Sequence, residues 1–94
     1  MAEYLVRVEL FNANAEEYNQ LHEQLGTLGL FRQIRADNGV YYDMPSGTYF
    51  GESGLGPAEL QVRVSREADR LSHPRAASVF VARLTDWQSS LHQS

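Results

Sequence analysis

The 94-residue sequence contains no cysteine and no lysine, and its hydrophobic residues never form a long run. The absence of cysteine excludes disulfide bonds, thiolate catalysis and cysteine zinc sites. No apolar run approaches the roughly 18 residues that a membrane-spanning helix needs. The first ten residues lack a basic segment followed by a long apolar one, so we expect no signal peptide, no membrane association and a cytoplasmic location.

Acidic residues outnumber basic ones, and the net charge of −4 argues against a general nucleic-acid-binding protein. Residues 1–31 contain five acids and Arg7 alone, whereas residues 32–94 contain seven arginines and seven acids. Every basic residue is therefore arginine, which binds phosphate in a bidentate manner and stacks on bases. With 43% hydrophobic and 21% charged residues, the composition is typical of one globular domain over residues 1–94.

The pattern of residues 4–28 predicts a strand followed by a helix. Residues 4–10 alternate between apolar and polar side chains, which is typical of a half-buried strand. Asn14 and Glu17 have the spacing of a capping box, so they place a helix start at this point. Apolar side chains then recur at three- and four-residue steps on one helix face, which ends at Gly26 or, as the better left-handed cap, Gly29.

Residues 30–50 are predicted to form an antiparallel hairpin. Residues 30–36 and 40–44 are its strands, and Asn38-Gly39 supplies the two positive-φ residues of a type I′ turn. Residues 48–50 prolong or restart the second strand, and residues 51–56 are predicted to be a loop.

The remaining residues predict a helix, a strand and a tail. Pro57 fits a first helical turn, and although residues 60–64 alternate like a strand, the longer apolar spacing favours a helix that stops at His73-Pro74. Residues 78–84 form the last strand. A polar tail follows from about residue 86, anchored at most by Trp87 and Leu91.

The resulting order β-α-β-β-α-β predicts an α+β, ferredoxin-like fold. With right-handed crossovers, it gives an antiparallel sheet with two helices on one face. The other face would be open and would carry Leu5, Arg7, Glu9 and part of the hairpin. Because the core is small and one face is uncovered, we expect a homodimer or a tight complex with a partner.

The sequence contains no strong catalytic motif. The three histidines lack metal-ligand spacing, so we expect neither a metal nor a cofactor. His22 lies beside the apolar stripe of the first helix, where it either bonds a carbonyl at the edge of the core or transfers protons. Asp37 either stabilises the hairpin turn through its side chain or takes part in chemistry. Tyr41 and Tyr42 alternate along a strand, so one should pack and the other should be exposed, where it can stack on a base.

Three stretches carry a resemblance to a known family: residues 4–10 (YLVRVEL), residues 18–22 (YNQLH), and residues 29–34 (GLFRQI) followed by residues 37–39 (DNG). Together they resemble the GhoS-type family, whose named member is the RNA-cleaving antitoxin of a type V toxin–antitoxin system. The resemblance spans residues 4–84. It implies a ferredoxin-like fold similar to the small nuclease-like subunit of CRISPR adaptation, and metal-independent cleavage of single-stranded RNA. The antitoxin has an arginine-rich stretch in its first helix, where this sequence has Gln20 and His22.

Two functions follow from these observations. In the first, the RNA 2′-OH attacks the neighbouring phosphate, with His22 or Asp37 as base and Arg7, Arg32 or Arg35 as the cation that meets the developing charge. In the second, the chain is a non-enzymatic protein-binding module, such as a phage or mobile-element inhibitor whose acidic N-terminal third docks a basic partner surface. Arginines clustered on one face would favour RNA, and dispersed arginines would favour the protein partner.

Overall fold

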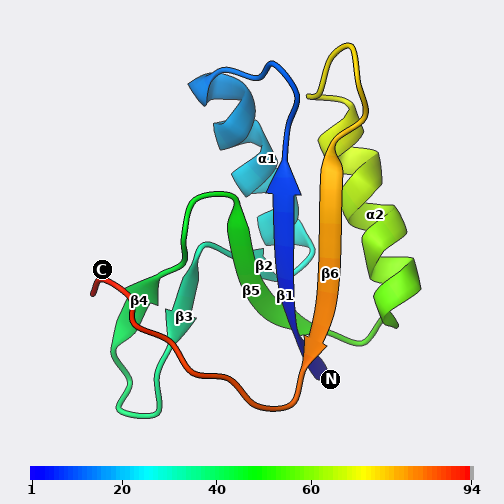
Figure 1. Ribbon diagram of the computed structural model, residues 1–94. Coiled ribbons are helices and arrows are strands. Elements are labelled where there is room, and N and C mark those ends of the chain that lie inside the picture. The colour runs from blue at the N-terminus through cyan, green and yellow to red at the C-terminus, as the bar shows by residue number, and fades with distance from the viewer. Residues whose placement is uncertain (94) are drawn as a thin grey trace.

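The computed structural model describes residues 1–93 and contains two helices that lie on the same side of a four-stranded sheet (Figure 1). The predicted α+β class is confirmed. The elements in chain order are β1 (Ala2–Glu9), α1 (Ala15–Thr27), β2 (Leu30–Phe31), β3 (Gln33–Arg35), β4 (Tyr41–Asp43), β5 (Thr48–Ser53), α2 (Pro57–Asp69) and β6 (Ser78–Leu84).

The four strands of the larger sheet are arranged in the order β2-β5-β1-β6, and every neighbouring pair is antiparallel. Strand β1 is central: it pairs with β5 on one side and with β6 on the other. Strands β3 and β4 pair only with each other and form a separate two-stranded hairpin beside the main sheet.

The core lies between the sheet and the two helices. Alternate residues of β1 are buried there, as the sequence pattern predicts. Helix α1 contributes Leu21 and Leu25, and α2 contributes three buried residues at four-residue steps, Leu60, Val64 and Ala68. The intervening Val62 is 52% exposed, so the helical reading of residues 60–64 is confirmed. Burial of each Leu or Val side chain contributes about 1.5–3 kcal/mol to folding.

Both helices begin where the sequence predicts. The Asn14 side chain accepts a hydrogen bond from the Glu17 backbone N–H at 2.9 Å, and the Glu17 carboxylate accepts one from the Asn14 N–H at 3.1 Å. Helix α1 ends at Thr27, ahead of Gly29. Helix α2 ends at Asp69, earlier than the predicted stop, because its last turn already closes onto the loop through residues 71 and 72. Of the described helices, neither is long and apolar enough to cross a bilayer.

The hairpin turn differs from the prediction. Gly39 has a φ of +85°, but Asn38 is not among the residues with positive φ, so the turn is not type I′. Instead, the Gly39 N–H donates to the Ala36 carbonyl at 2.9 Å, and the Ala36 N–H donates to the Val40 carbonyl at 2.9 Å. This is the three-residue loop in which a glycine follows an ordinary turn and supplies the only left-handed residue. The Asn38 side chain accepts from the Val40 N–H at 3.0 Å, a bond that the sequence analysis assigned to Asp37.

The two middle strands are each interrupted, which is a second correction. The predicted strand over residues 30–36 occurs as β2 and β3, because the chain leaves the main sheet at Arg32 and joins β4 instead. The second predicted strand breaks after β4 and restarts as β5. Strand β5 continues to Ser53, so half of the predicted loop over residues 51–56 is strand.

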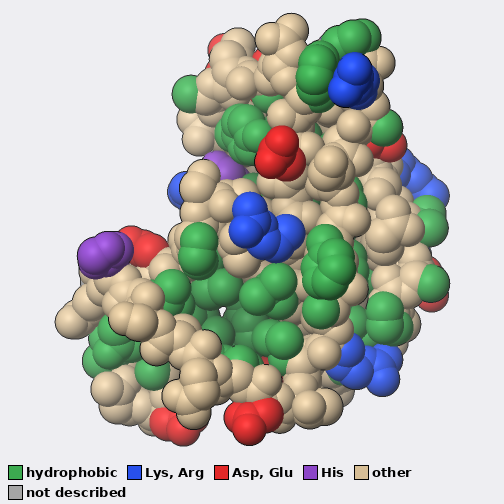
Figure 2. Space-filling model, in the orientation of Figure 1, with side chains coloured by type: hydrophobic (Ala, Val, Ile, Leu, Met, Phe, Trp, Pro, Cys, Tyr) green, Lys and Arg blue, Asp and Glu red, His purple; other side chains and the backbone are tan. Residues whose placement is uncertain are grey.

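The face of the sheet away from the helices is partly covered by the hairpin and the C-terminal tail. The tail runs from the end of β6 back to β4, where the Asp43 N–H donates to the His92 carbonyl at 2.9 Å (Figure 1). Trp87 packs edge-on against Phe50 with ring centroids 6.1 Å apart, so the predicted anchoring by Trp87 is confirmed. Figure 2 shows hydrophobic side chains gathered on the lower half of this face.

Candidate functional site

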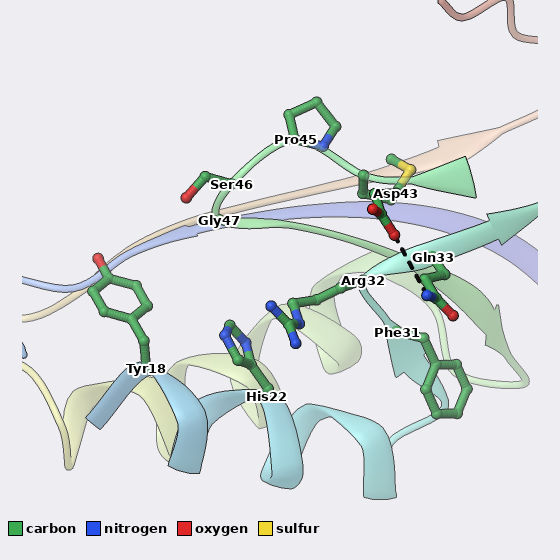
Figure 3. Close-up of a pocket in the computed structure, with 10 residues that line it drawn as sticks. Tyr18, His22, Phe31, Arg32, Gln33, Asp43, Pro45, Ser46 and Gly47 are labelled. Carbon is green, nitrogen blue, oxygen red and sulfur yellow. Dashed lines mark hydrogen bonds between the residues drawn. The ribbon is translucent and has the colours of Figure 1, made fainter. Parts of the chain in front are cut away.

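A cleft of about 720 Å³ opens between α1 and the segments that enter and leave the hairpin (Figure 3). Helix α1 forms one wall, residues 31–33 the second, and the β4–β5 connection the third. Its volume is in the usual range for small-molecule and nucleotide sites. The lining residues are Tyr18, His22, Phe31, Arg32, Gln33, Asp43, Met44, Pro45, Ser46 and Gly47.

The helix wall is positioned by local sequence. Tyr18 and His22 are four residues apart, so they lie on the same face of α1. The Tyr18 hydroxyl accepts a hydrogen bond from the Leu10 N–H at 3.0 Å, which ties the first turns of α1 to the end of β1. The capping box fixes the start of the helix, and the rotation of α1 therefore sets where His22 points.

His22 is held by a tyrosine from the sheet. Its Nδ1 lies 2.6 Å from the hydroxyl of Tyr49, a residue of β5 that is fully buried. The sequence analysis expected a carbonyl as the partner of His22, and the structure places a hydroxyl there. A hydroxyl can donate or accept, so the bond is compatible with both neutral tautomers of the imidazole. In either tautomer it leaves Nε2 as the ring nitrogen available to the cleft.

The protonation states of this pair follow from burial and from Arg32. Burial, and next the positive charge of Arg32, lower the pKa of His22 from its ordinary value near 6.5. Burial raises the pKa of Tyr49 to about 12, against the smaller opposing effect of Arg32. At neutral pH the histidine is therefore neutral and the tyrosine is protonated.

Arg32 supplies the positive charge of the cleft. Its guanidinium points toward the His22 ring (Figure 3). Its backbone carbonyl accepts from the Met44 N–H at 2.7 Å, which holds two walls of the cleft together. Within residues 1–93, the ion pairs are Glu59–Arg63 and Glu67–Arg70, both on α2. No ion pair in this part of the chain neutralises Arg32, so its charge is available to an anion.

One carboxylate completes the polar groups of the cleft. Asp43 lies on the wall opposite α1 and accepts a hydrogen bond from the Gln33 amide at 3.4 Å (Figure 3). The cleft therefore combines a neutral imidazole, an unneutralised guanidinium and a carboxylate. Among residues 1–93, no three His, Asp or Glu side chains are placed to hold a metal ion together.

The structure brings together only two of the residues that the sequence singled out. His22 and Arg32 share the cleft. Asp37 and Arg35 line a different hollow at the tip of the hairpin, so the two candidate bases belong to separate sites. Arg7 lies on the far face of the sheet, directly opposite Phe80 in the β1–β6 register.

The two hairpin tyrosines differ as alternation predicts, although neither is fully buried. Tyr41 is 50% exposed, and the Arg35 guanidinium lies 5.9 Å from its ring centroid. Tyr42 is half-buried: it pairs with Ile34 across the hairpin and forms a bridge to Gln93 of the tail.

Sequence reasoning missed Tyr18, Tyr49 and Asp43 as members of the site. The four-residue spacing of Tyr18 and His22 is a signal that could have found the first. The contact between His22 and Tyr49 spans 27 residues and depends on how α1 packs on β5. No local pattern carries that information.

Comparisons with known proteins returned no match. Neither a scan against protein-family models nor a search of the curated proteins found a counterpart of this chain.

Proposed function

We propose that the cleft binds single-stranded RNA and cleaves it without a metal ion, as the resemblance to the GhoS-type antitoxin family implies. One observation carries the proposal: a neutral histidine, held at Nδ1 by Tyr49, presents Nε2 beside the unneutralised guanidinium of Arg32. A base next to a cation is the arrangement that phosphodiester transfer by an internal hydroxyl requires.

The reaction can be assigned to these two residues. In the tautomer in which Nδ1–H donates to the Tyr49 hydroxyl oxygen, Nε2 of His22 carries a free lone pair and accepts the proton of the RNA 2′-OH. The 2′-oxygen attacks the adjacent phosphorus while the guanidinium of Arg32 binds the charge on a non-bridging oxygen. The bond from phosphorus to the 5′-oxygen breaks, and that oxygen takes a proton from water. The products are a 2′,3′-cyclic phosphate and a 5′-hydroxyl.

An exposed aromatic ring at the cleft provides a surface for a base. Phe31 is 56% exposed and lines the cleft beside Arg32. Unpaired RNA bases stack on such rings, whereas a duplex offers no free base face, and this favours a single-stranded substrate. We assign Arg35, Tyr41 and Tyr42 to the path of the flanking RNA and Arg7, on the far face, to a separate contact.

The same proposal includes a ferredoxin-like fold. Two features support it: both helices pack on one face, and the strand order β2-β5-β1-β6 places the first and last strands side by side. The fold is obtained if β2 with β3, and β4 with β5, are each counted as one interrupted strand.

The distribution of the arginines favours a second candidate function. They are dispersed over the cleft, the hairpin, the far face of the sheet, α2 and the loop after it, and do not form one basic face. Dispersed arginines are the pattern expected for a protein-binding module. In that role the acidic residues of β1 and α1 would meet a basic partner surface, as in a phage or mobile-element inhibitor.

Incubation of the purified protein with end-labelled single-stranded RNA in EDTA separates these candidates. The RNA proposal predicts cleavage by the wild type, loss of at least about 100-fold in the His22→Ala variant, and an unchanged rate in a His73→Ala control. His73 is exposed and lies far along the chain, after α2. If the wild type leaves the RNA intact, or if both variants cleave equally well, the RNA proposal is wrong and the protein-binding candidate replaces it.

A further inference from the structure

Strand β6 presents a full unpaired edge. All seven of its residues pair with β1, from Ser78 opposite Glu9 to Leu84 opposite Glu3. The strand is the last in the sheet order, so within residues 1–93 its other side has no neighbouring strand (Figure 1). Alternate backbone N–H and C=O groups along this edge therefore point away from the sheet. Such an edge is a template for another strand.

The devices that normally protect an edge are missing from β6. It contains no proline and no lysine, and its only charged residue is Arg83. That side chain is drawn toward the core: it donates to the Tyr4 hydroxyl at 3.3 Å, and its guanidinium lies 5.8 Å from the Tyr4 ring centroid. The opposite edge of the sheet is formed by the two-residue β2 and is too short to recruit a strand.

We propose that β6 pairs antiparallel with β6 of a second copy of this chain, with the two-fold axis at Val81. Centring on Val81 is the register that pairs all seven residues of both strands. It makes the two sheets continuous, with eight strands across the dimer. The proposal concerns association alone and is independent of RNA cleavage.

The side chains of β6 fit this self-pairing. Phe80 is 64% exposed although it lies in a strand, and in this register it faces the partner's Ala82, a small residue over which the ring can pack. Arg83 faces the partner's Val79, so no like charges meet. A register centred two residues further along would place Arg83 opposite its own copy, and an in-register parallel pair would also bring the two arginines together.

The absence of cysteine allows a direct test by crosslinking. In a Val81→Cys variant, the two introduced residues would be directly opposite each other, with Cβ atoms about 4.5–5.5 Å apart, close enough for a disulfide after a small adjustment. In the matched control Ser78→Cys, each cysteine would face the partner's Leu84 and be far from its copy. We expect mild oxidation to convert Val81→Cys to a covalent dimer at least ten times faster than Ser78→Cys. Equal rates would overturn the register.

Light scattering tests the association itself. The wild type should show twice the 10.6 kDa mass of one chain at high micromolar concentration. Phe80→Lys should weaken dimerisation at least tenfold, because it places a charge on the pairing edge, whereas Phe31→Lys, at another exposed phenylalanine, should leave the dimer intact. A wild type that keeps the mass of one chain at every concentration, or a Phe31→Lys variant that dissociates as much as Phe80→Lys, would overturn the proposal.

Discussion

The two faces of the main sheet are covered in different ways. On one face two helices of 13 residues each pack on β1, and Tyr4 and Val6 are completely buried. On the other face, Leu5 is only half-buried and Phe80 is 64% exposed. A cavity of about 280 Å³ remains there between the sheet, the hairpin and the tail.

The difference follows from the chemistry of the covering segments. Each helix contributes a continuous apolar stripe, whereas the tail contributes Trp87 and Leu91 separated by Gln88, Ser89 and Ser90. The helix-covered face therefore supplies most of the stability. The other face and the β6 edge are left for association, and the cleft forms where the helix layer meets the hairpin.

The largest expected effect is a core truncation on the helix-covered face. Leu21→Ala removes a fully buried side chain and should lower the free energy of unfolding by about 2–5 kcal/mol. Leu5→Ala on the other face should cost about 1 kcal/mol, because that side chain is already partly in water. Urea denaturation of both variants measures the difference, and equal losses would contradict the contrast between the faces.

A glycine pair tests the close contact between β5 and the start of β2. A side chain at Gly51 would overlap the Gly29 carbonyl oxygen, whereas a Cβ at Gly54 would meet nothing within 4 Å. Gly51→Ala should therefore destabilise the protein by about 1–3 kcal/mol through overpacking, and Gly54→Ala should be nearly neutral. Thermal melts decide this; a Gly51→Ala variant as stable as Gly54→Ala would show that β2 is not held against β5 as described.

The tail should contribute less than either. Trp87→Ala removes the edge-on contact with Phe50 and should cost about 1–2 kcal/mol. It should also increase the binding of a hydrophobic dye to the uncovered face. If dye binding and the melting temperature both stay at wild-type values, the tail does not cover this face in solution.

Much of the fold was predictable because its signals are local. The capping box of Asn14 and Glu17, the alternation of β1 and the extent of β6 could all be read from neighbouring residues. The turn type could not, because Gly39 supplies the positive φ in both a two-residue and a three-residue loop. The pairing of Ile34 with Tyr42 decides between them.

The candidate site was only half predictable for the same reason. His22 and Arg32 are residue types that suggest chemistry wherever they occur. Their meeting, and the bond to Tyr49, depend on the chain leaving the sheet at Arg32 and on the packing of α1 against β5. Both are long-range outcomes that no short pattern specifies.

The smallest expected effect is a change in the titration of His22. Its pKa is lowered in the folded state, so protonation favours the unfolded chain and stability falls as the pH drops below about 6.5. Arg32→Gln removes one cause of the lowering, so the midpoint of the His22 ring signals in an NMR titration should move to higher pH, while that of His73 should not move. An unchanged midpoint would show that Arg32 does not lie against the imidazole.

The most direct test of the proposed chemistry is the identity of the RNA ends. Mass spectrometry of the fragments released from single-stranded RNA in EDTA should find 2′,3′-cyclic phosphates and 5′-hydroxyls, and a 2′-deoxy substitution at the cleaved position should abolish the cut. Fragments with 3′-hydroxyls and 5′-phosphates, or cleavage that survives the 2′-deoxy substitution, would contradict attack by the 2′-oxygen and the role of His22 as its base.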